Sequence, residues 1–375
     1  MCTSFRCYQK EQERLAVFRI TFPIHSAFLL KIYIFTPNKS IMAVSLVTGG
    51  AGFIGAHVVN ELISMNHKVV VLDDLSGGFE DYVNSEAIFI NGSVYDHVLL
   101  ENLFNEYKFD YVYHLAAYAA EGLSHFIRRF NYNNNLVGSI NLINESVKHK
   151  VKCFVFTSSI AVYGAAKPPM KEETFPMPED PYGVAKFAVE MDLKTAHEMF
   201  GLNYVVFRPH NVYGEYQNIG DKYRNVVGIF MNQLMQGQQL SVFGDGLQTR
   251  AFSYIGDVAP YIANSVNVKE AYNEVFNVGA DQEYTVKELA TEVMAAMGIT
   301  GELRYLEARN EVVHAHSDHS KIKRVFNIKD SDFTSLSVGL KKMADWAKVV
   351  GARKSGVFEN IEISEKLPPF WVEKK

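Results

Sequence analysis

Tyr182 and Lys186 stand four residues apart in the stretch Tyr-Gly-Val-Ala-Lys, which is expected to be helical. Positions four apart share one face of a helix, so the Lys186 ammonium is expected beside the Tyr182 phenol. A cation there favours the phenolate and lowers the tyrosine pKa from about 10 toward neutral pH. The pair is therefore a candidate general base for a substrate hydroxyl. Because this spacing also occurs by chance in many helices, the assignment needs support from the rest of the chain.

A hydroxyl group is expected near this pair. The apolar run Cys153–Thr157 leads directly into Ser158 and Ser159. Ser159 would hold the substrate oxygen that Tyr182 deprotonates. The alternative is that both serines only cap a turn, and it carries more weight for Ser158.

A glycine-rich turn lies between the apolar run Val44–Val47 and the amphipathic stretch Ala56–Met65. Gly49 would allow a tight turn, Gly52 would let the backbone approach a pyrophosphate, and Gly55 would let the helix pack closely on the strand. The helix N-terminus then faces the negative charge of the phosphates. Strand, turn and helix in this order predict a dinucleotide site.

An acidic side chain follows the next predicted strand, Lys68–Leu72. Asp73 lies about 20 residues beyond the glycines, where a carboxylate can accept hydrogen bonds from an adenosine ribose. A phosphorylated ribose would be repelled by Asp73 and Asp74, and no Arg or Lys follows until far downstream. The sequence therefore predicts NAD as the cofactor and not NADP.

Short apolar runs alternate with helical stretches from Met42 onward, which predicts a parallel sheet with helices on both faces. The expected class is α/β, a Rossmann-type doubly wound sheet with a smaller C-terminal substrate-binding lobe. Ligands of such sheets lie beyond the carboxyl ends of the strands, so chemistry is expected in the loops after Thr157 and Phe207. The expected strands are Val69–Leu72, Ile88–Ile90, Tyr111–His114, Cys153–Thr157, Tyr204–Phe207 and Val275–Val278.

A chain of 375 residues has room for two domains at about 150 residues each. We expect an N-terminal extension at 1–41, an NAD-binding domain at 42–207, a sugar-binding lobe mainly at 208–345 and a tail at 346–375, with strands near 251–279 returning to the first domain. The extension is expected to be flexible. Its apolar stretch Ile20–Phe35 is interrupted by polar residues and is shorter than the ~20 residues of a membrane span, although a peripheral anchor is an alternative.

Charge and residue composition indicate which classes of binding partner and which compartment to expect. The net charge of −5 gives no sign of nucleic-acid binding. Three cysteines without a Cys-x-x-Cys pair fit a reducing, cytoplasmic compartment. The twelve histidines show no metal-ligand spacing, and His314, His316 and His319 are expected on a surface strand or turn.

Taken together, these motifs resemble the extended short-chain dehydrogenase/reductases of the NAD-dependent nucleotide-sugar epimerase/dehydratase family, and most of all its UDP-glucose 4-epimerase-like members. The resemblance covers about Met42 to Trp346. It is carried by Thr48-Gly-Gly-Ala-Gly-Phe-Ile-Gly55, Asp73, His114-Leu-Ala-Ala117, Asn134, Ser159, Val162-Tyr-Gly164, Tyr182-Gly-Val-Ala-Lys186, Arg208-Pro-His-Asn-Val-Tyr-Gly214 and Arg250-Ala-Phe-Ser-Tyr-Ile255.

The resemblance implies further site residues. Around the cofactor it implies Phe53 and Ile54 at the pyrophosphate, Ser93 and Val94 at the adenine, and Leu115, Ala116 and Asn134 along the remainder. Around a nucleoside-diphosphate sugar, expected to be a UDP-sugar, it implies Asn211, Asn225, Val226, Phe243, Arg250 and Glu311. Arg250 can supply a forked contact to a diphosphate. Ser93 departs from the family pattern, in which an Asp usually follows that glycine.

Two positions separate the possible reactions. Sugar 4,6-dehydratases carry an Asp-Glu pair just before Val-Tyr-Gly, whereas this chain has Ile160 and Ala161, which can transfer no proton. The sequence therefore resembles the epimerases, and the expected substrate is a UDP-hexose or UDP-hexuronate changed at C4. Alternatives are another nucleotide-sugar oxidoreductase or dehydratase and, more remotely, a non-catalytic NAD-sensing regulator, which the intact Ser159, Tyr182 and Lys186 disfavour.

The resemblance also implies a mechanism and an assembly. Tyr182 would take the proton from the sugar O4 while the C4 hydride passes to NAD, and hydride would return to the other face after the sugar ring has turned. Relatives pair through two helices per subunit. Here the stretches Asn102–Lys108, Asn134–Lys148 and Pro181–Phe200 would form the interface of a homodimer, with Leu142, Val147, Phe187 and Met191 among its apolar positions.

Overall fold

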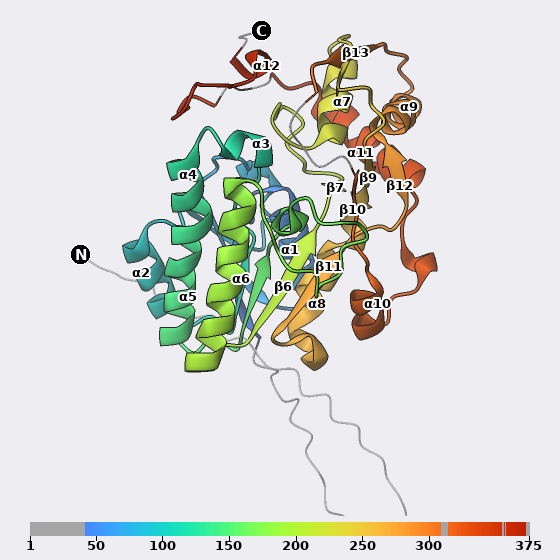
Figure 1. The fold of residues 1–375 in the computed structure, drawn as a ribbon. Coiled ribbons are helices and arrows are strands. Elements are labelled where there is room, and N and C mark those ends of the chain that lie inside the picture. The colour runs from blue at the N-terminus through green and yellow to red at the C-terminus, as the bar shows by residue number, and fades with distance from the viewer. Residues whose placement is uncertain (1–41, 309–313, 355, 357, 373–375) are drawn as a thin grey trace, which may run out of the picture. The chain divides into compact units, whose positions relative to one another are not determined.

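The computed structural model describes residues 42–308, 314–354, 356 and 358–372, so the predictions for Met1–Ile41 and Glu311 lie outside the described residues. From Met42 onward the chain forms one compact unit, in which β6 and β11 lie side by side (Figure 1). Its large sheet has seven parallel strands in the order β3-β2-β1-β4-β5-β6-β11. The order reverses between β1 and β4, which is the hallmark of a doubly wound sheet. The predicted α/β class is confirmed.

The strands of this sheet are β1 (Val44–Thr48), β2 (Lys68–Asp73), β3 (Ile88–Asn91), β4 (Tyr111–His114), β5 (Cys153–Thr157), β6 (Tyr204–Pro209) and β11 (Glu274–Val278). The longer helices around it are α1 (Phe53–Ser64), α2 (His97–Tyr107), α5 (Gly138–Lys148), α6 (Pro181–Phe200) and α8 (Ala259–Asn264). The short helices α3 (Glu121–Ser124) and α4 (Arg128–Tyr132) precede a π-helical turn, Asn133–Val137, that runs into α5.

Helices cover both faces of the sheet, and alternate side chains of each strand point to opposite faces, so both sets of side chains are buried. Leu46 and Val70 pack on the face covered by α2, α5 and α6. Val47 and Val71 pack on the opposite face with α1 and α8, in a core that continues into the C-terminal half. The apolar runs in the sequence reflect this burial on both faces.

The C-terminal half adds three small sheets, β7 with β10, β9 with β12 and β14, and β8 with β13. Their strands are β7 (Val212–Tyr213), β8 (Leu240–Phe243), β9 (Thr249–Ala251), β10 (Ser253–Tyr254), β12 (Glu283–Thr285), β13 (Leu303–Leu306) and β14 (His314–Ala315). The helices between and after them are α7 (Val226–Met235), α9 (Val286–Met297), α10 (Ser320–Phe326), α11 (Leu336–Val350) and α12 (Pro369–Val372). The strand β11, which lies between β10 and β12 in the sequence, belongs to the large sheet instead and pairs there with β6.

The predicted strands agree with the observed ones to within two residues, but α1 begins at Phe53, three residues before the expected Ala56. The turn is tight enough for the helix to start directly after Gly52. No helix within the described ranges is long and apolar enough to span a membrane.

Candidate active site

The glycine turn has the geometry of a pyrophosphate cradle. Gly49 has a φ of +73°, and a Cβ on it would stand 2.6 Å from the backbone nitrogen of Ala116. A Cβ on Gly55 would lie 2.0 Å from the carbonyl oxygen of Gly49, so only glycine lets α1 start so close to β1. Gly52 is the N-cap of α1 and offers no side chain to the first turn, which leaves the helix N-terminus to a ligand phosphate. These residues fit NAD.

Asp73 ends β2 beside this turn and is mostly buried. Its carboxylate accepts hydrogen bonds from the backbone N–H groups of Ala51 at 3.0 Å and Leu75 at 2.8 Å. Burial raises the pKa of Asp73, and these two hydrogen bonds oppose that rise. The carboxylate therefore braces the turn as well as facing the ribose position.

The three predicted catalytic side chains are brought together. Tyr182 and Lys186 lie on the first turns of α6 and are 5% and 2% exposed, and Ser159 stands just beyond β5. The Lys186 Nζ lies 5.8 Å from the centre of the Tyr182 ring and donates a hydrogen bond to the carbonyl oxygen of Thr157 at 2.8 Å. Ser159 is hydrogen-bonded to the Tyr182 phenol.

The expected electrostatics are wrong in one respect. Burial raises the pKa of Tyr182 above its usual value, the nearby charge of Glu121 adds to the rise, and the hydrogen bond with Ser159 opposes it. Burial also lowers the pKa of Lys186 to about 7. Spacing alone predicted a charged lysine that lowers the tyrosine pKa, whereas the enclosed site disfavours charge on both groups. NAD supplies a positively charged nicotinamide when bound, which favours the phenolate.

Ser158 has a different role from Ser159. Its hydroxyl donates to the Glu190 carboxylate at 2.5 Å, and Arg208 donates to the same carboxylate through Nε at 3.0 Å. Glu190 and Arg208 are both buried. This ion pair ties α6 to β6, so Ser158 braces the site, whereas Ser159 interacts with the Tyr182 phenol.

One cavity of about 1440 Å³ joins the glycine turn to the catalytic residues. Its volume exceeds the ~300–1,000 Å³ of a site for one drug-sized ligand, so it has room for a dinucleotide and a second large ligand. The predicted residues that line it are Gly49, Gly52, Phe53, Ile54, Gly55, Asp73, Val94, Leu115, Ala116, Asn134, Ser159, Tyr182, Lys186, Asn211, Asn225, Phe243 and Arg250.

Two predicted residues lie elsewhere. Ser93 is not among the lining residues, although Gly92 and Val94 are, and its hydroxyl accepts a hydrogen bond from the Tyr95 N–H at 3.2 Å. Val226 lines a second cavity of about 210 Å³ that shares Asn211, Asn225 and Arg250 with the first.

Sequence reasoning missed several groups in the main cavity. Arg224 lies in a loop without a motif, forms an ion pair with Asp221 at 2.6 Å and stacks its guanidinium over the Tyr118 ring at 4.8 Å. His125 and the C-terminal residues 363, 365–369 and 371 also line the cavity. No local pattern marked them, because their position depends on long-range packing.

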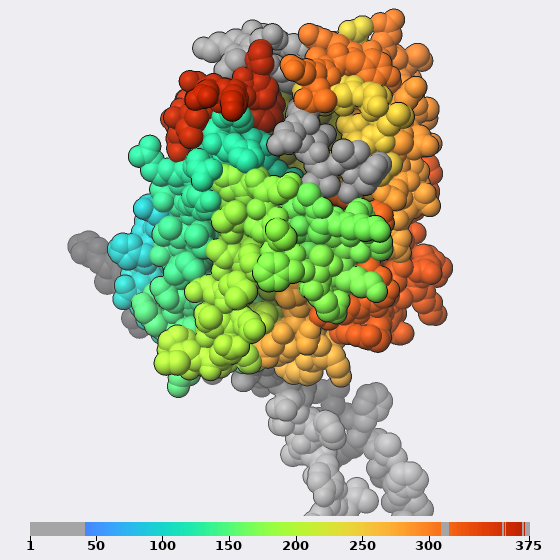
Figure 2. Space-filling model, viewed as in Figure 1, coloured from blue at the N-terminus to red at the C-terminus, as the bar shows by residue number. Residues whose placement is uncertain are grey.

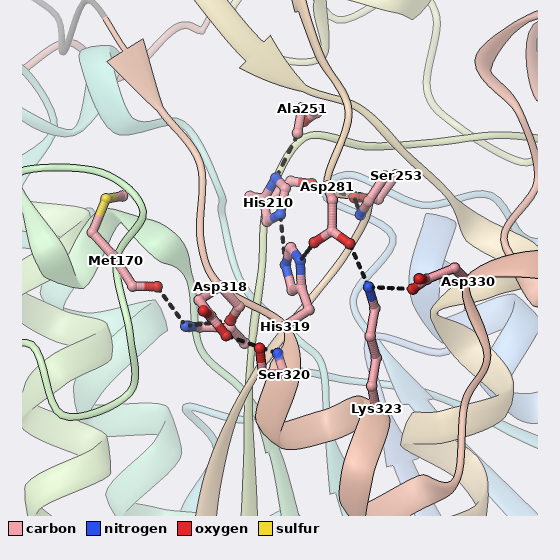
Figure 3. A network of polar contacts seen from close by, with 12 residues as sticks. Met170, His210, Ala251, Ser253, Asp281, Asp318, His319, Ser320, Lys323 and Asp330 are labelled. Atoms are coloured by element: carbon pink, nitrogen blue, oxygen red, sulfur yellow. Dashed lines mark hydrogen bonds and ion pairs between the residues drawn. The ribbon is translucent and has the colours of Figure 1, made fainter.

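A polar network around two buried histidines holds the loops near Asn211 (Figure 3). His210, next to Asn211, contacts the Ala251 carbonyl oxygen at 3.2 Å and the His319 ring at 3.0 Å between Nε2 atoms. His319 in turn contacts Asp281 at 2.6 Å. His319 is only 1% exposed, so its expected surface position is wrong: the pairing with His210 and Asp281 satisfies its ring nitrogens inside the fold. No cluster of possible metal ligands occurs within the described ranges.

Comparison with known proteins agrees with this site. A protein of Methanocaldococcus jannaschii provisionally named a UDP-glucose 4-epimerase is 35% identical over 81% of this chain and 98% of its own length. The dTDP-D-glucose 4,6-dehydratase of Mus musculus is 30% identical over 90% of this chain and 96% of its own. The crystal structure of the Thermotoga maritima UDP-glucose 4-epimerase with UDP-glucose superposes with a TM-score of 0.77 at 34% identity, over 82% of this chain and 99% of that one.

The profile of the NAD dependent epimerase/dehydratase family matches residues 45–279, which include the glycine turn, Tyr182 with Lys186, and Arg250. With this match and the glycine turn, the chain belongs to the NAD-dependent epimerase/dehydratase family, whose members act on nucleotide sugars.

Proposed function

We propose that this protein is an NAD-dependent 4-epimerase of a nucleoside-diphosphate sugar, and that the substrate is a UDP-hexose or UDP-hexuronate. The observation that carries the proposal is the pair Ile160 and Ala161. Both line the cavity directly after Ser159, at the start of the 3-10 turn Ile160–Tyr163, and neither can give or take a proton. A reaction that needs only Tyr182, Lys186, Ser159 and NAD fits these walls better than an elimination.

In the proposed reaction, NAD held at the glycine turn and Asp73 would supply an acceptor for the sugar C4 hydride and its later return. Ser159 holds the sugar O4 by hydrogen bonding, and the Tyr182 phenolate takes the O4 proton as C4 is oxidised. Lys186, fixed through Thr157, lies beside the phenol and helps it carry negative charge. Tyr182 gives the proton back to O4 when hydride returns to the other face of the turned ring, so the enzyme ends the cycle unchanged.

The substrate-side residues support a diphosphate ligand. Arg250 and Asn225 line both the main and the smaller cavity, and Phe243 offers an aromatic surface beside them. A guanidinium in this position can bind phosphate oxygens in a forked geometry. Firm binding of the diphosphate would keep the keto sugar in place while its ring turns.

A dehydratase is the second candidate, because carboxylates do reach the chemistry. Glu121 and Asp180 line the cavity, and the charge of each acts on the Tyr182 phenol. Asp180 also accepts the Gly183 N–H at the start of α6, so Glu121 is the carboxylate to test. In an elimination this carboxylate would be the acid or base that Ile160 and Ala161 cannot provide. Glu121→Gln should then lower turnover by about 100-fold or more, whereas an epimerase should lose far less.

The product formed in deuterated water tests the proposal directly. Purified protein, without added NAD, is incubated with a panel of UDP, dTDP and GDP sugars. We expect the same mixture of two C4 epimers from either starting epimer, with no deuterium at C4 or C5, because hydride returns directly. Deuterium at C5 or a 4-keto-6-deoxy product would overturn the epimerase in favour of the dehydratase.

We also propose that the enzyme is a cytoplasmic homodimer that pairs through α5 and α6. Val137, Val184 and Met191 are apolar and exposed on and beside these helices, at 39%, 39% and 47%. Leu142 is fully buried inside the subunit and so is not available to a partner. Exposed apolar side chains on adjoining helices support a self-complementary surface.

A further inference from the structure

The C-terminal segment Phe358–Trp371, here called the C-terminal strap, runs beside the residues that surround the catalytic tyrosine. Figure 2 shows the end of the chain, in red, against the teal surface of the α3 and α4 region. The backbone N–H of Phe358 donates to the Tyr223 hydroxyl at 2.9 Å, on the substrate side of the cavity. The strap therefore links a substrate-side loop to the helices that precede α5.

A carboxylate fixes the middle of the strap to α4. Glu362 accepts hydrogen bonds from the backbone N–H groups of Arg129 and Phe130, both at 2.9 Å. Its own N–H donates to the Phe126 carbonyl oxygen at 2.8 Å. A negative charge on the first amides of a helix is the favoured arrangement, so this contact sets the register of the strap.

An aromatic side chain fixes its end. Trp371 is 3% exposed, and its ring lies 6.0 Å from that of Phe126 and 5.5 Å from that of Tyr223. A Cβ on Gly122 would stand 3.1 Å from the Trp371 ring, so α3 is packed closely against it. The strap is thus a loop whose two ends meet at Tyr223 and whose middle is fixed to α4.

The same segment forms part of the cavity wall. Ile363, Glu365, Leu367 and Pro368 of the strap line the cavity that also contains Tyr182. The supporting helix α3 touches the catalytic residue as well, because the Ser124 hydroxyl accepts the backbone N–H of Tyr182 at 3.3 Å. The strap therefore lines the cavity that contains Tyr182 and packs on the helix that contacts this residue.

We propose that the C-terminal strap is the outer wall of the sugar subsite, which limits the size of the sugar and retains the keto intermediate until hydride returns. The proposal rests on the proposed epimerase function.

Three variants test the wall: Glu362→Gln, Trp371→Ala and a chain that ends at Gly356. One readout is the fraction of bound cofactor that stays reduced after incubation with UDP-glucose, measured by nicotinamide absorbance. The other is the ratio of kcat/KM for UDP-N-acetylglucosamine to that for UDP-glucose. Both should rise, by roughly 10-fold in the shortened chain, because an open end loses the keto sugar and admits a larger substituent. Glu359→Gln, an exposed carboxylate on the same strap, is the control and should match the wild type.

A measurement without turnover separates this proposal from the epimerase assignment. Hydrogen exchange at the Glu362 and Ile363 amides should slow when UDP-glucose binds and stay unchanged with UDP alone. If the product assay shows a dehydratase, this exchange and the substrate ratio still test the wall. The wall would be ruled out if folded Glu362→Gln showed the same kcat/KM ratio and the same fraction of reduced cofactor as the wild type. It would also be ruled out if UDP-glucose and UDP alone had the same effect on hydrogen exchange at these amides. Should the shortened chain or Trp371→Ala fail to fold, Glu362→Gln decides.

Discussion

Tyr182 and Lys186 are buried, although the proposed reaction requires charge on them. Burial stabilises the neutral phenol of Tyr182 and so raises its pKa. Burial also destabilises the Lys186 ammonium and so lowers the pKa of that group to about 7. Such sites are less stable than the fold could make them, because they are arranged for the reaction.

Tyr182→Phe should lower turnover by 100-fold or more, since general base catalysis contributes ~10²–10⁴ in rate. The change keeps the ring, so NAD should remain bound and the melting temperature should change little. Steady-state rates with a UDP-hexose, together with the nicotinamide content of the purified protein, measure both effects. Turnover close to that of the wild type would remove Tyr182 from the mechanism.

Lys186→Met should stabilise the NAD-free protein while it abolishes activity. The folded pKa of Lys186 is about 7, below its usual 10.5, so the unfolded chain binds more protons between pH 7 and 10.5 and stability rises with pH in that window. The free energy of unfolding of the variant should therefore exceed that of the wild type by roughly 1–4 kcal/mol at pH 7, because within this window the charge on Lys186 destabilises the folded wild type most at pH 7. The difference should shrink toward pH 10. Denaturant unfolding at several pH values measures it, and a loss of stability at pH 7 contradicts the interpretation.

At the level of secondary structure, the network of His210, His319 and Asp281 holds the β6–β7 connection, which carries Asn211, and the end of β9, which carries Arg250 (Figure 3). Burial first, then the neighbouring His319, lowers the pKa of His210 to about 3. Asp281 opposes this shift and His316 adds to it. His210 is therefore neutral in the folded protein at neutral and mildly acidic pH.

Stability should fall as pH drops below about 6.5, because the unfolded chain then takes up a proton that folded His210 refuses until about pH 3. At pH 5 the loss from this one group should reach about 2 kcal/mol. His210→Asn, which keeps a donor and an acceptor, should show a shallower fall than the wild type in denaturant unfolding between pH 7 and 5. Equal slopes for the two proteins would count against a neutral buried His210.

The strands and the glycine turn could be predicted because local patterns decide them. The runs Tyr111–His114 and Cys153–Thr157 are buried on both faces and match β4 and β5 to the residue. The buried position of His319, the place of Arg224 and the strap around Trp371 depend on residues far away in the chain, and no local pattern carries that information. The same holds for the pKa of Tyr182, since burial is a property of the fold.

At the level of the whole molecule, the proposed dimer can be tested on exposed apolar side chains. The wild type should scatter light as twice the chain mass of 42.4 kDa at micromolar concentration. Met191→Glu on α6 should raise the dissociation constant roughly 10-fold or more, because a carboxylate buried without a partner costs over about 1.4 kcal/mol. Val349→Glu, at an 88% exposed position of α11, is the matched control. A monomeric wild type, or equal effects of the two changes, would rule out this interface.

The pairing of β11 with β6 has a consequence for synthesis of the protein. β6 ends at Pro209, but β11, which covers its outer edge, begins only at Glu274. A chain emerging from the ribosome therefore exposes that edge of β6 while the intervening segment is translated. Open strand edges pair readily with other chains. We expect nascent chains stalled before residue 274 to aggregate or bind chaperones, and chains stalled well beyond Val278 to resist protease.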